Sequence, residues 1–481
     1  FFFTIDFMED IEKWIQEGKT IDEKRTDVDL FDHKYRYTEL GLKDRFIDYV
    51  DGELFFVPEI NKWLYWNEKK WEIDFSETEV NQRGISMVEE MRHQLAFFLR
   101  VDDNARDYTE GQEFVTNIEK ISRIKGFINA ARSSNLRKKI TAFDTKEHLF
   151  NLENGTYDFS KNKFKTLHDK EDFLMKIASA QYKENAHSEK WDDFIQFIFS
   201  EDDRFIEYVQ KAVGYSLTES TSEQCLFILY GEGQNGKTVF LNVISKMLGD
   251  YSANTPIETL LAKKAKNTVS NDLARLKDIR FVTASESDRQ DFFSEARIKA
   301  LTGGDTITAR YLHKENFEYT PKFKIWIATN YRPVIRSTDL SIWRRIKVIP
   351  FNNVVKKINR NLEKELLEEK SGILNWAIEG YKKWASQGLG DVPEVMSLAI
   401  DEYKLEADIV GRFLNDKCRE TNEGRVPKGE LYKEYEKWTR ENGEFKETQK
   451  MLGRILNKRG YVEQKSGGTR YWKGIEIIKE H

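Results

Sequence analysis

The stretch Cys225–Thr238, CLFILYGEGQNGKT, constrains the fold of this chain more than any other. Its first half predicts a buried strand over Leu226–Tyr230, and its second half has the spacing G-x-x-x-x-G-K-S/T. Residues Val239–Leu248 carry apolar side chains at helical spacing before Gly249, so a helix is expected after the loop. A strand, a glycine loop and a helix in this order predict an α/β core with a phosphate-binding loop (P-loop).

Each part of this loop has an expected chemical role. Glycines let backbone N–H groups curl around phosphate oxygens, Lys237 is expected to reach the β- and γ-phosphates, and Thr238 is expected to bind Mg²⁺. The expected cofactors are therefore ATP and Mg²⁺, and a glycine turn inside a core is the weaker alternative. The residues expected around the nucleotide are Gly231, Glu232, Gly233, Gln234, Asn235, Gly236, Lys237, Thr238 and Val239.

Composition excludes several classes of protein. The 481 residues suggest about three domains, and 39% hydrophobic content with 32 Phe and 11 Trp is enough for sizeable cores. A net charge of −5 argues against a protein that coats nucleic acid, but not against an enzyme whose basic groups line one channel. The two cysteines, Cys225 and Cys418, supply neither a disulfide scaffold nor a zinc finger, which fits a reducing cytoplasm.

The N-terminal stretch FFFTIDF is apolar but too short for a signal segment or a membrane-spanning helix, so no membrane role is expected. The chain begins with Phe rather than Met, which is compatible with a longer protein. Two cysteines cannot form a zinc cluster, and residues 1–84 show no convincing set of paired carboxylates with a partner His, so no metal-dependent catalytic domain is expected there.

Two further apolar runs end in residues suited to ATP hydrolysis. The run Ile279–Thr283 leads to Glu286, which is expected to act as the general base and to help hold the metal with Thr238. The run FKIWIATN ends at Asn330, whose amide is expected to orient the attacking water or to sense the γ-phosphate. Ser285 stands where a second acid was expected. Taken alone, an acid after a strand is as often structural as catalytic, and an asparagine there more often only caps the strand.

Two basic features lie around the third strand. The stretches IKALTGGDTITAR and YLHKENFEYTP predict a β-hairpin with His313 and Lys314 near its tip, where they could hold DNA phosphates in a channel. Arg344 and Arg345 precede the next strand, and such an arginine can act in trans as a finger that stabilises transition-state charge. A plain surface hairpin and a solvated strand edge are the alternatives.

The N-terminal part reads as small strands and helices. The stretch LFFVPEINKWLYWNEKKWEID predicts antiparallel strands, and its tryptophans, Trp63, Trp66 and Trp71, are expected in the core of this sheet rather than as a base-stacking surface. Asn154–Gly155 predicts the turn of a second hairpin. The expected domains are 1–140, mixed and helical; 141–215, hairpin and helical; 216–355, the ATPase core; 356–410, a helical lid or linker; and 411–481, a winged helix.

Residues 411–481 are the positive end of the chain, with 17 basic and 12 acidic side chains. Helices are predicted at Phe413–Glu420, Lys428–Arg440 and Thr448–Arg459, followed by two strands about Gly467–Gly468. This order looks like a winged helix whose third helix enters the major groove. A winged helix used only for protein contacts is the alternative. The expected DNA contacts are Arg454, Lys458, Arg459, Lys465 and Arg470.

These motifs together resemble the superfamily III helicases of the poxvirus and satellite-phage primase-helicase type, over roughly Leu149–Trp384. The resemblance implies an AAA+-like core, a homo-oligomeric and hexameric ring, ATP bound between subunits, and movement along single-stranded DNA. It matches Lys237 and Thr238 to the nucleotide motif, Glu286 to the acidic motif, Asn330 to the sensor, and Arg345, or second Arg344, to the arginine finger. It matches Lys299, Gly303, Gly304, Asp305 and Arg310 to a family-specific motif, and Lys299, His313 and Lys314 are the expected DNA contacts of the core.

The expected function is that of an ATP-dependent DNA helicase that forms a ring on single-stranded DNA and unwinds duplex to replicate a mobile genetic element. Its expected partners are single-stranded and forked DNA, a replication-origin duplex bound through the winged helix, and host replication proteins. One alternative is a phosphotransferase with the same loop. The other is a winged-helix ATPase switch or regulator that does not unwind DNA.

Overall fold

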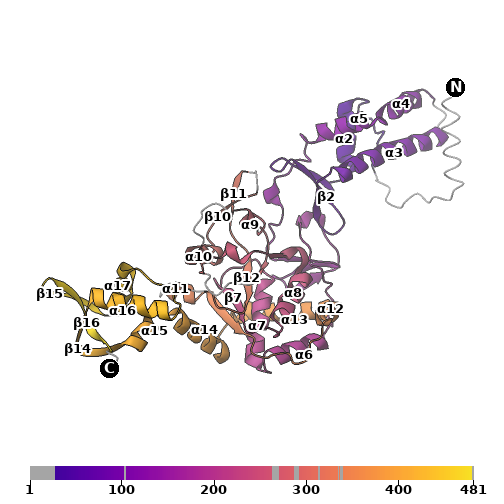
Figure 1. Ribbon diagram of the computed structural model, residues 1–481. Helices are drawn as coiled ribbons and strands as arrows, with labels where there is room; N and C mark the ends of the chain where they lie inside the picture. Colours follow the sequence, from indigo (N-terminus) through magenta and orange to yellow (C-terminus); the bar gives the residue numbers. More distant parts are fainter. Residues whose placement is uncertain are drawn as a thin grey trace. The chain divides into compact units, whose positions relative to one another are not determined.

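This computed structural model describes residues 28–101, 105–262, 270–285, 292–311, 315–333, 335 and 340–478 (Figure 1). The chain divides into two units. One contains the chain up to Lys146 together with His168–Lys176, and the other contains Glu147–Leu167 and the chain from Ile177 on. The glycine loop belongs to the second unit.

The first unit combines helices with a small antiparallel sheet in the order β1-β2-β3, as the aromatic stretch predicted. Trp63 and Trp71 are fully buried, and Trp66 is half-buried. The interpretation of these rings as core is therefore confirmed for Trp63 and Trp71. The elements are α2 (Glu39–Tyr49), β1 (Leu54–Val57), β2 (Lys62–Trp66), β3 (Trp71–Asp74), α3 (Thr78–Val101), α4 (Ala105–Ile118) and α5 (Ile121–Ala131).

The second unit is built on a parallel sheet of five strands in the order β13-β7-β12-β9-β8. Both faces of a parallel sheet are covered, which is why its strands read as nearly continuous apolar runs. Helices α7, α8 and α13 lie beside this sheet in Figure 1. The strands are β7 (Leu226–Tyr230), β8 (Ser252–Asn254), β9 (Phe281–Ser285), β12 (Lys324–Thr329) and β13 (Ile346–Pro350), and the helices are α7 (Asp203–Ser216), α8 (Lys237–Leu248) and α13 (Lys370–Gln387).

Helices α7 and α13 pack unusually closely because each presents a glycine at the contact. A Cβ atom on Gly214 would lie 2.0 Å from the backbone N of Tyr381, and one on Gly380 would lie 2.0 Å from the backbone O of Gln210. Neither position has room for a larger residue. Glycine at both positions therefore lets the backbones of the two helices come into direct contact.

A second small antiparallel sheet, β4-β5-β6, precedes α7. The predicted hairpin is confirmed, but its turn lies one residue earlier than expected, because Leu152 pairs with Gly155 and leaves Glu153 and Asn154 in the turn. Gly155 is needed in the strand, since a Cβ atom there would lie 2.1 Å from the backbone O of Lys165. The strands are β4 (Leu149–Leu152), β5 (Gly155–Asp158) and β6 (Lys163–Lys165).

The C-terminal part of the second unit has its own core around Phe413, Tyr435 and Trp472, all buried. The predicted helix Phe413–Glu420 is too long, because the chain from Cys418 on pairs with β16 in the sheet β14-β16-β15. The other two helices and both arms about the glycine pair are confirmed. The elements are α15 (Ile409–Lys417), β14 (Cys418–Pro427), α16 (Lys428–Glu441), α17 (Gln449–Lys458), β15 (Val462–Ser466) and β16 (Thr469–Ile477).

The remaining elements connect these parts. The strands β10 (Ile307–Arg310) and β11 (Asn316–Tyr319) form an antiparallel pair, which confirms the predicted β-hairpin. The chain is thus a mixed α/β protein with one parallel sheet and several small antiparallel sheets. The connecting helices are α6 (Glu189–Ile198), α9 (Ser270–Ala274), α10 (Glu295–Gly303), α11 (Leu340–Trp343), α12 (Leu362–Glu368) and α14 (Glu394–Ala407).

Candidate functional site

The register of the parallel sheet brings the start of the glycine loop, the end of β9 and Asn330 together at the carboxyl ends of the strands. The last residue of β7, Tyr230, pairs with Thr329 of β12, and Ser285 at the end of β9 pairs with Ala328 of β12. Asn330 follows Thr329 and is exposed, so it stands between the glycine loop and the end of β9. Glu286 comes directly after Ser285 but lies outside the described residues.

The glycine loop has the tight backbone that its sequence predicted. Gly236 has a φ of 87°, a left-handed conformation that favours glycine, and it immediately precedes α8. A Cβ atom on Gly231 would lie 2.4 Å from the side-chain nitrogen of Asn235 and 2.4 Å from the backbone O of Phe351. The loop therefore needs glycine at both ends. It leads into the N-terminus of a twelve-residue helix, which favours an anion.

Lys237 is the charged group inside this loop. Its side chain is buried, with 6% of the residue exposed, and Nζ donates to the backbone O of Gly231 at 2.6 Å and to Oδ1 of Asn235 at 2.9 Å. Burial lowers the pKa of Lys237 to about 8. Thr238 beside it is exposed, as are Glu232, Gly233 and Gln234, whereas Val239 is half-buried.

The two predicted finger arginines lie at the other end of the strands, the amino end, directly before β13. The backbone O of Arg345 accepts from the N–H of Leu226, the first residue of β7, at 2.8 Å. The length of β7 therefore separates this arginine from the loop by about 13 Å. Arg345 is 8% exposed and Nη1 donates to the backbone O of Ser341 at 2.7 Å. Arg344 is exposed and Nη2 donates to Oε1 of Gln224 at 3.2 Å.

Only some of the predicted DNA contacts of the core belong to the described residues. His313 and Lys314 lie outside the described residues, although the strands that flank them are described. Lys299 is half-buried on α10, a helix whose C-cap is Gly304 with a φ of 80°. Arg310, the last residue of β10, is exposed.

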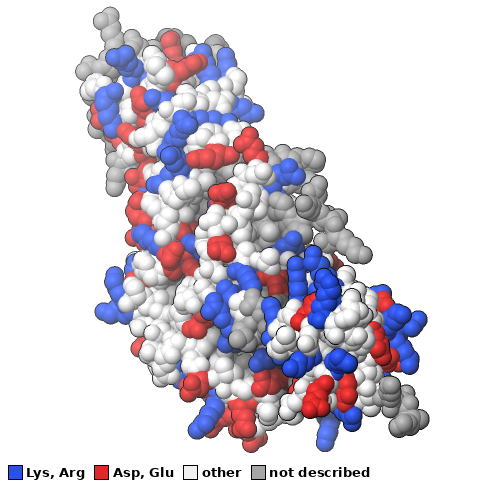
Figure 2. Space-filling view, turned by 90° about the vertical axis from the view of Figure 1, so that its left-hand side faces the viewer, with Lys and Arg blue, Asp and Glu red and all other residues white. Residues whose placement is uncertain are grey.

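The predicted basic residues of the C-terminal part fall into two groups. Arg454, Lys458 and Lys465 are exposed, and Arg454 and Lys458 lie on α17, whose other face is buried. Arg459 instead pairs with the carboxylate of Asp408, which caps α15, and Arg470 lies 3.3 Å from the carboxylate of Glu463. Figure 2 shows Lys and Arg side chains in several groups on this lobe, with acidic side chains among them.

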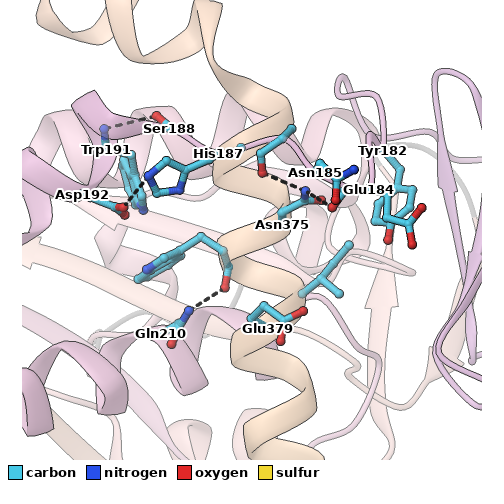
Figure 3. Close-up of a pocket in the computed structure, with 14 residues that line it drawn as sticks. Tyr182, Glu184, Asn185, His187, Ser188, Trp191, Asp192, Gln210, Asn375 and Glu379 are labelled. Atoms are coloured by element: carbon cyan, nitrogen blue, oxygen red, sulfur yellow. Dashed lines mark hydrogen bonds and ion pairs between the residues drawn. The ribbon is translucent and has the colours of Figure 1, made fainter.

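A cavity of about 380 Å³ lies elsewhere in the second unit, lined by α6, α7, α13 and the loop before α6. Figure 3 shows His187 facing Asp192, with Nε2 and Oδ2 3.2 Å apart. The Asn375 side chain holds the loop by donating to the backbone O of Lys183 at 2.7 Å and of Ala186 at 2.9 Å. No predicted site residue lines this cavity. No local motif marks it, because it is formed by helices far apart in sequence.

Within the described part of the chain, no group of three or more His, Cys, Asp or Glu is placed to hold a metal ion. A metal at the glycine loop would rest on Thr238 and on groups outside the described residues. Among the described helices, none combines the length and the apolar character that crossing a membrane requires.

Two family models match separate parts of the chain. Residues 43–200 match the family described as "D5 N terminal like", and residues 229–345 match a "Family of unknown function (DUF5906)". The second match contains the glycine loop, both neighbouring strand ends and the arginine pair.

Several viral proteins are similar to this chain. "Putative helicase L207/L206" of Acanthamoeba polyphaga mimivirus is 26% identical over 79% of this chain and 43% of its own length. "Putative helicase 022R" of Frog virus 3 is 25% identical over 47% of this chain and 25% of its own length. "Putative primase C962R" of African swine fever virus is 21% identical over 71% of this chain and 39% of its own length. The chain spans less than half the length of these relatives.

Solved structures with a similar fold include one of the NrS-1 protein. The apo structure of the NrS-1 C-terminal region aligns with a TM-score of 0.50 and 12% identity, over 90% of this chain and 98% of that one. At this identity the likeness concerns the fold alone. The D5-like match and the viral relatives fit a primase-helicase of the phage or viral type, as the resemblance of the motifs predicted.

Proposed function

We propose that this chain is the ATP-hydrolysing DNA helicase part of a replication protein of the phage or viral primase-helicase type. The observation that carries the proposal is the meeting of the glycine loop, the end of β9 and Asn330 at one edge of the parallel sheet. The names of the viral relatives support the assignment to replication. The strand order also supports an AAA+-like core, because β12 lies between the loop strand and the strand that leads to Glu286.

The residues at the carboxyl ends of these strands fit a nucleoside triphosphate. The loop is a cradle that a Cβ atom at Gly231 would fill, and Lys237 brings a cation into it. Thr238 and Glu286 would hold Mg²⁺, which would supply positive charge to the phosphates. Glu286 would accept the proton of the attacking water, and the amide of Asn330 would orient that water.

The position of Arg344 and Arg345 supports a shared site. Neither arginine reaches the loop of its own chain, so a finger role requires a second copy. We assign this role to Arg344, which the resemblance ranked second, because its side chain is exposed. Arg345 is buried and bonded to the backbone of α11, which suits a structural role. A ring of copies arranged head to tail would complete every site.

The order of elements in the C-terminal part supports a winged helix that binds duplex DNA. Helix α17 would enter the major groove, and β15 and β16 would form the wing. The exposed side chains of Arg454 and Lys458 are the best placed to contact phosphates. A regulator with a winged helix that only switches with ATP remains the second candidate.

Replacing Arg454 and Lys458 together by alanine is expected to weaken the salt dependence of duplex binding. The slope of log K against log salt concentration should become less steep by about two. For each phosphate contact that is lost, binding releases about one counterion fewer from the DNA. The measurement is a salt titration of duplex affinity. The Lys433→Ala/Lys437→Ala variant is the matched control, because it removes the same charge from exposed positions on α16. An unchanged slope in the first variant would rule out this binding face.

The pKa of Lys237 predicts how nucleotide binding depends on pH. Its pKa of about 8 means that the ammonium loses its proton above that pH, so ADP affinity measured without Mg²⁺ is expected to fall by up to about tenfold per pH unit above pH 8. The Lys237→Arg variant keeps its charge and should show no such fall. A wild-type affinity that stays constant to about pH 9.5 would contradict the prediction.

The same shift affects the stability of the fold in the opposite direction. The ordinary pKa of this lysine is 10.5, and in the folded protein it is about 8. Between these values the unfolded chain binds more protons than the folded one. This group therefore adds stability as the pH rises through that window.

The function is tested with forked DNA that carries only a 3′ tail or only a 5′ tail. With ATP, unwinding is expected for one of the two forks, and Glu286→Gln should bind the fork without unwinding it. A regulatory switch would bind duplex and hydrolyse ATP without separating strands. A phosphotransferase would show no stimulation of hydrolysis by single-stranded DNA. Either result would replace the helicase proposal.

A further inference from the structure

Asn235 lies inside the glycine loop with both ends of its amide engaged. Its residue is 3% exposed, and Nδ2 donates to the backbone O of Phe351 at 2.9 Å while Oδ1 accepts from Nζ of Lys237 at 2.9 Å. The orientation of the amide is determined by chemistry, because a carbonyl oxygen can only accept and an ammonium can only donate. The reversed amide would face both partners with the wrong group.

This arrangement holds the ammonium of Lys237 without neutralising it. Its two acceptors, the backbone O of Gly231 and the amide of Asn235, are both uncharged. An ammonium has three N–H bonds, and within the described part of the chain the third has no acceptor. A phosphate oxygen is an acceptor with negative charge, and a bond to it is shorter and stronger than one between neutral groups. Lys237 is therefore held in place with one donor ready for phosphate.

The other end of the Asn235 amide ties the loop to β13. Phe351 follows the last residue of β13, and its own N–H donates to the backbone O of Tyr230 at 2.7 Å. The N–H of Val355 also donates to the backbone O of Gln234 at 2.9 Å. The position of Asn235 therefore depends on the segment after β13, and the position of Lys237 depends on Asn235.

We infer that Asn235 is a positioning residue that holds the Lys237 ammonium in its phosphate-binding position, using the backbone of Phe351 as its support. The inference rests on the proposed phosphate-binding function of the loop. Asn235 itself need not touch the nucleotide. Its contribution to binding passes through Lys237, so it should disappear when the ammonium is removed.

A double-mutant cycle on nucleotide affinity separates this role from a general role in the fold. Asn235→Ser, whose side chain is too short to reach both partners, is expected to weaken binding of a fluorescent ADP analogue by about tenfold. In the Lys237→Met background the same change is expected to weaken it less than about twofold. A loss of equal size in both backgrounds would overturn the inference, since it would show that Asn235 acts on the loop without Lys237.

Asn353→Ser is the matched control. Asn353 also fastens the segment after β13, since its Nδ2 donates to the backbone O of Phe197 at 2.5 Å and to Oγ of Ser200 at 3.1 Å. Its hydrogen bonds go to Phe197 and Ser200 and not to Lys237, so its loss should change affinity less than about twofold. A tenfold loss in this variant would also overturn the inference, because any damage to the segment would then suffice. Wild-type protein that binds no nucleotide would instead refute the proposed function itself.

Discussion

Lys237→Ala is expected to lower ATP turnover by at least about a hundredfold, because it removes the cation that would face the phosphates. The side chain is buried, and the two acceptors that hold it are uncharged, so neither of them can replace its charge. Steady-state hydrolysis with and without single-stranded DNA measures the effect. Nucleotide affinity should fall as well, since the lysine would contact phosphate in the ground state too.

Lys246→Ala is the matched control for this prediction. Lys246 lies on the same helix, α8, but its ammonium is exposed and pairs with the carboxylate of Glu363 at 2.5 Å. Losing an exposed pair of this kind costs little stability, and turnover should stay near the wild-type value. Wild-type turnover in Lys237→Ala would exclude the glycine loop as the catalytic site.

Arg344→Ala is expected to lower turnover by about a thousandfold or more while nucleotide affinity changes little, as for an arginine finger supplied in trans. The reason is geometric: the arginine precedes β13 at the amino end of the strands, whereas the loop follows β7 at their carboxyl end. Only a neighbouring copy could receive this guanidinium. Hydrolysis and nucleotide affinity must therefore be measured on the assembled protein.

Arg345→Ala provides the contrast. Its guanidinium is buried and donates to the backbone O of Ser341, so its loss should reduce the free energy of unfolding by about 2 kcal/mol. Turnover per folded molecule should change far less than in Arg344→Ala. The reverse outcome, with turnover lost in Arg345→Ala and kept in Arg344→Ala, would return the finger role to Arg345.

Mixing two inactive variants tests the shared site directly. Lys237→Ala supplies an intact finger, and Arg344→Ala supplies an intact loop. If the site forms between copies, a mixture should regain part of the wild-type turnover, because some interfaces combine the two intact halves. A mixture as inactive as its components would contradict a site shared in this way.

Much of the fold could be read from local patterns. The strand–loop–helix around Lys237 follows from apolar runs and glycine spacing, and the helices of the C-terminal part follow from helical periodicity. The prediction failed where pairing with a distant strand decided the outcome. Cys418 and the residues after it were assigned to a helix, but they pair with β16 more than forty residues later in the chain.

The candidate site shows the same division. Sequence alone predicted Lys237, Asn330 and the arginine pair as site residues, because each lies shortly before or after an apolar strand. It could not show that Arg345 is buried and Arg344 exposed, since adjacent residues differ in exposure only through what packs on them. The cavity beside His187 was also missed, because its walls come from separate helices.

The sequence by itself thus determined which residues form the loop and which strands and helices flank it. These features depend on neighbours a few residues away. Only the tertiary structure decided that β12 lies between β7 and β9, which brings Asn330 beside the loop, and that Phe351 reaches Asn235. Both results depend on strand register and on hydrogen bonds between residues far apart in the chain, which no local pattern encodes.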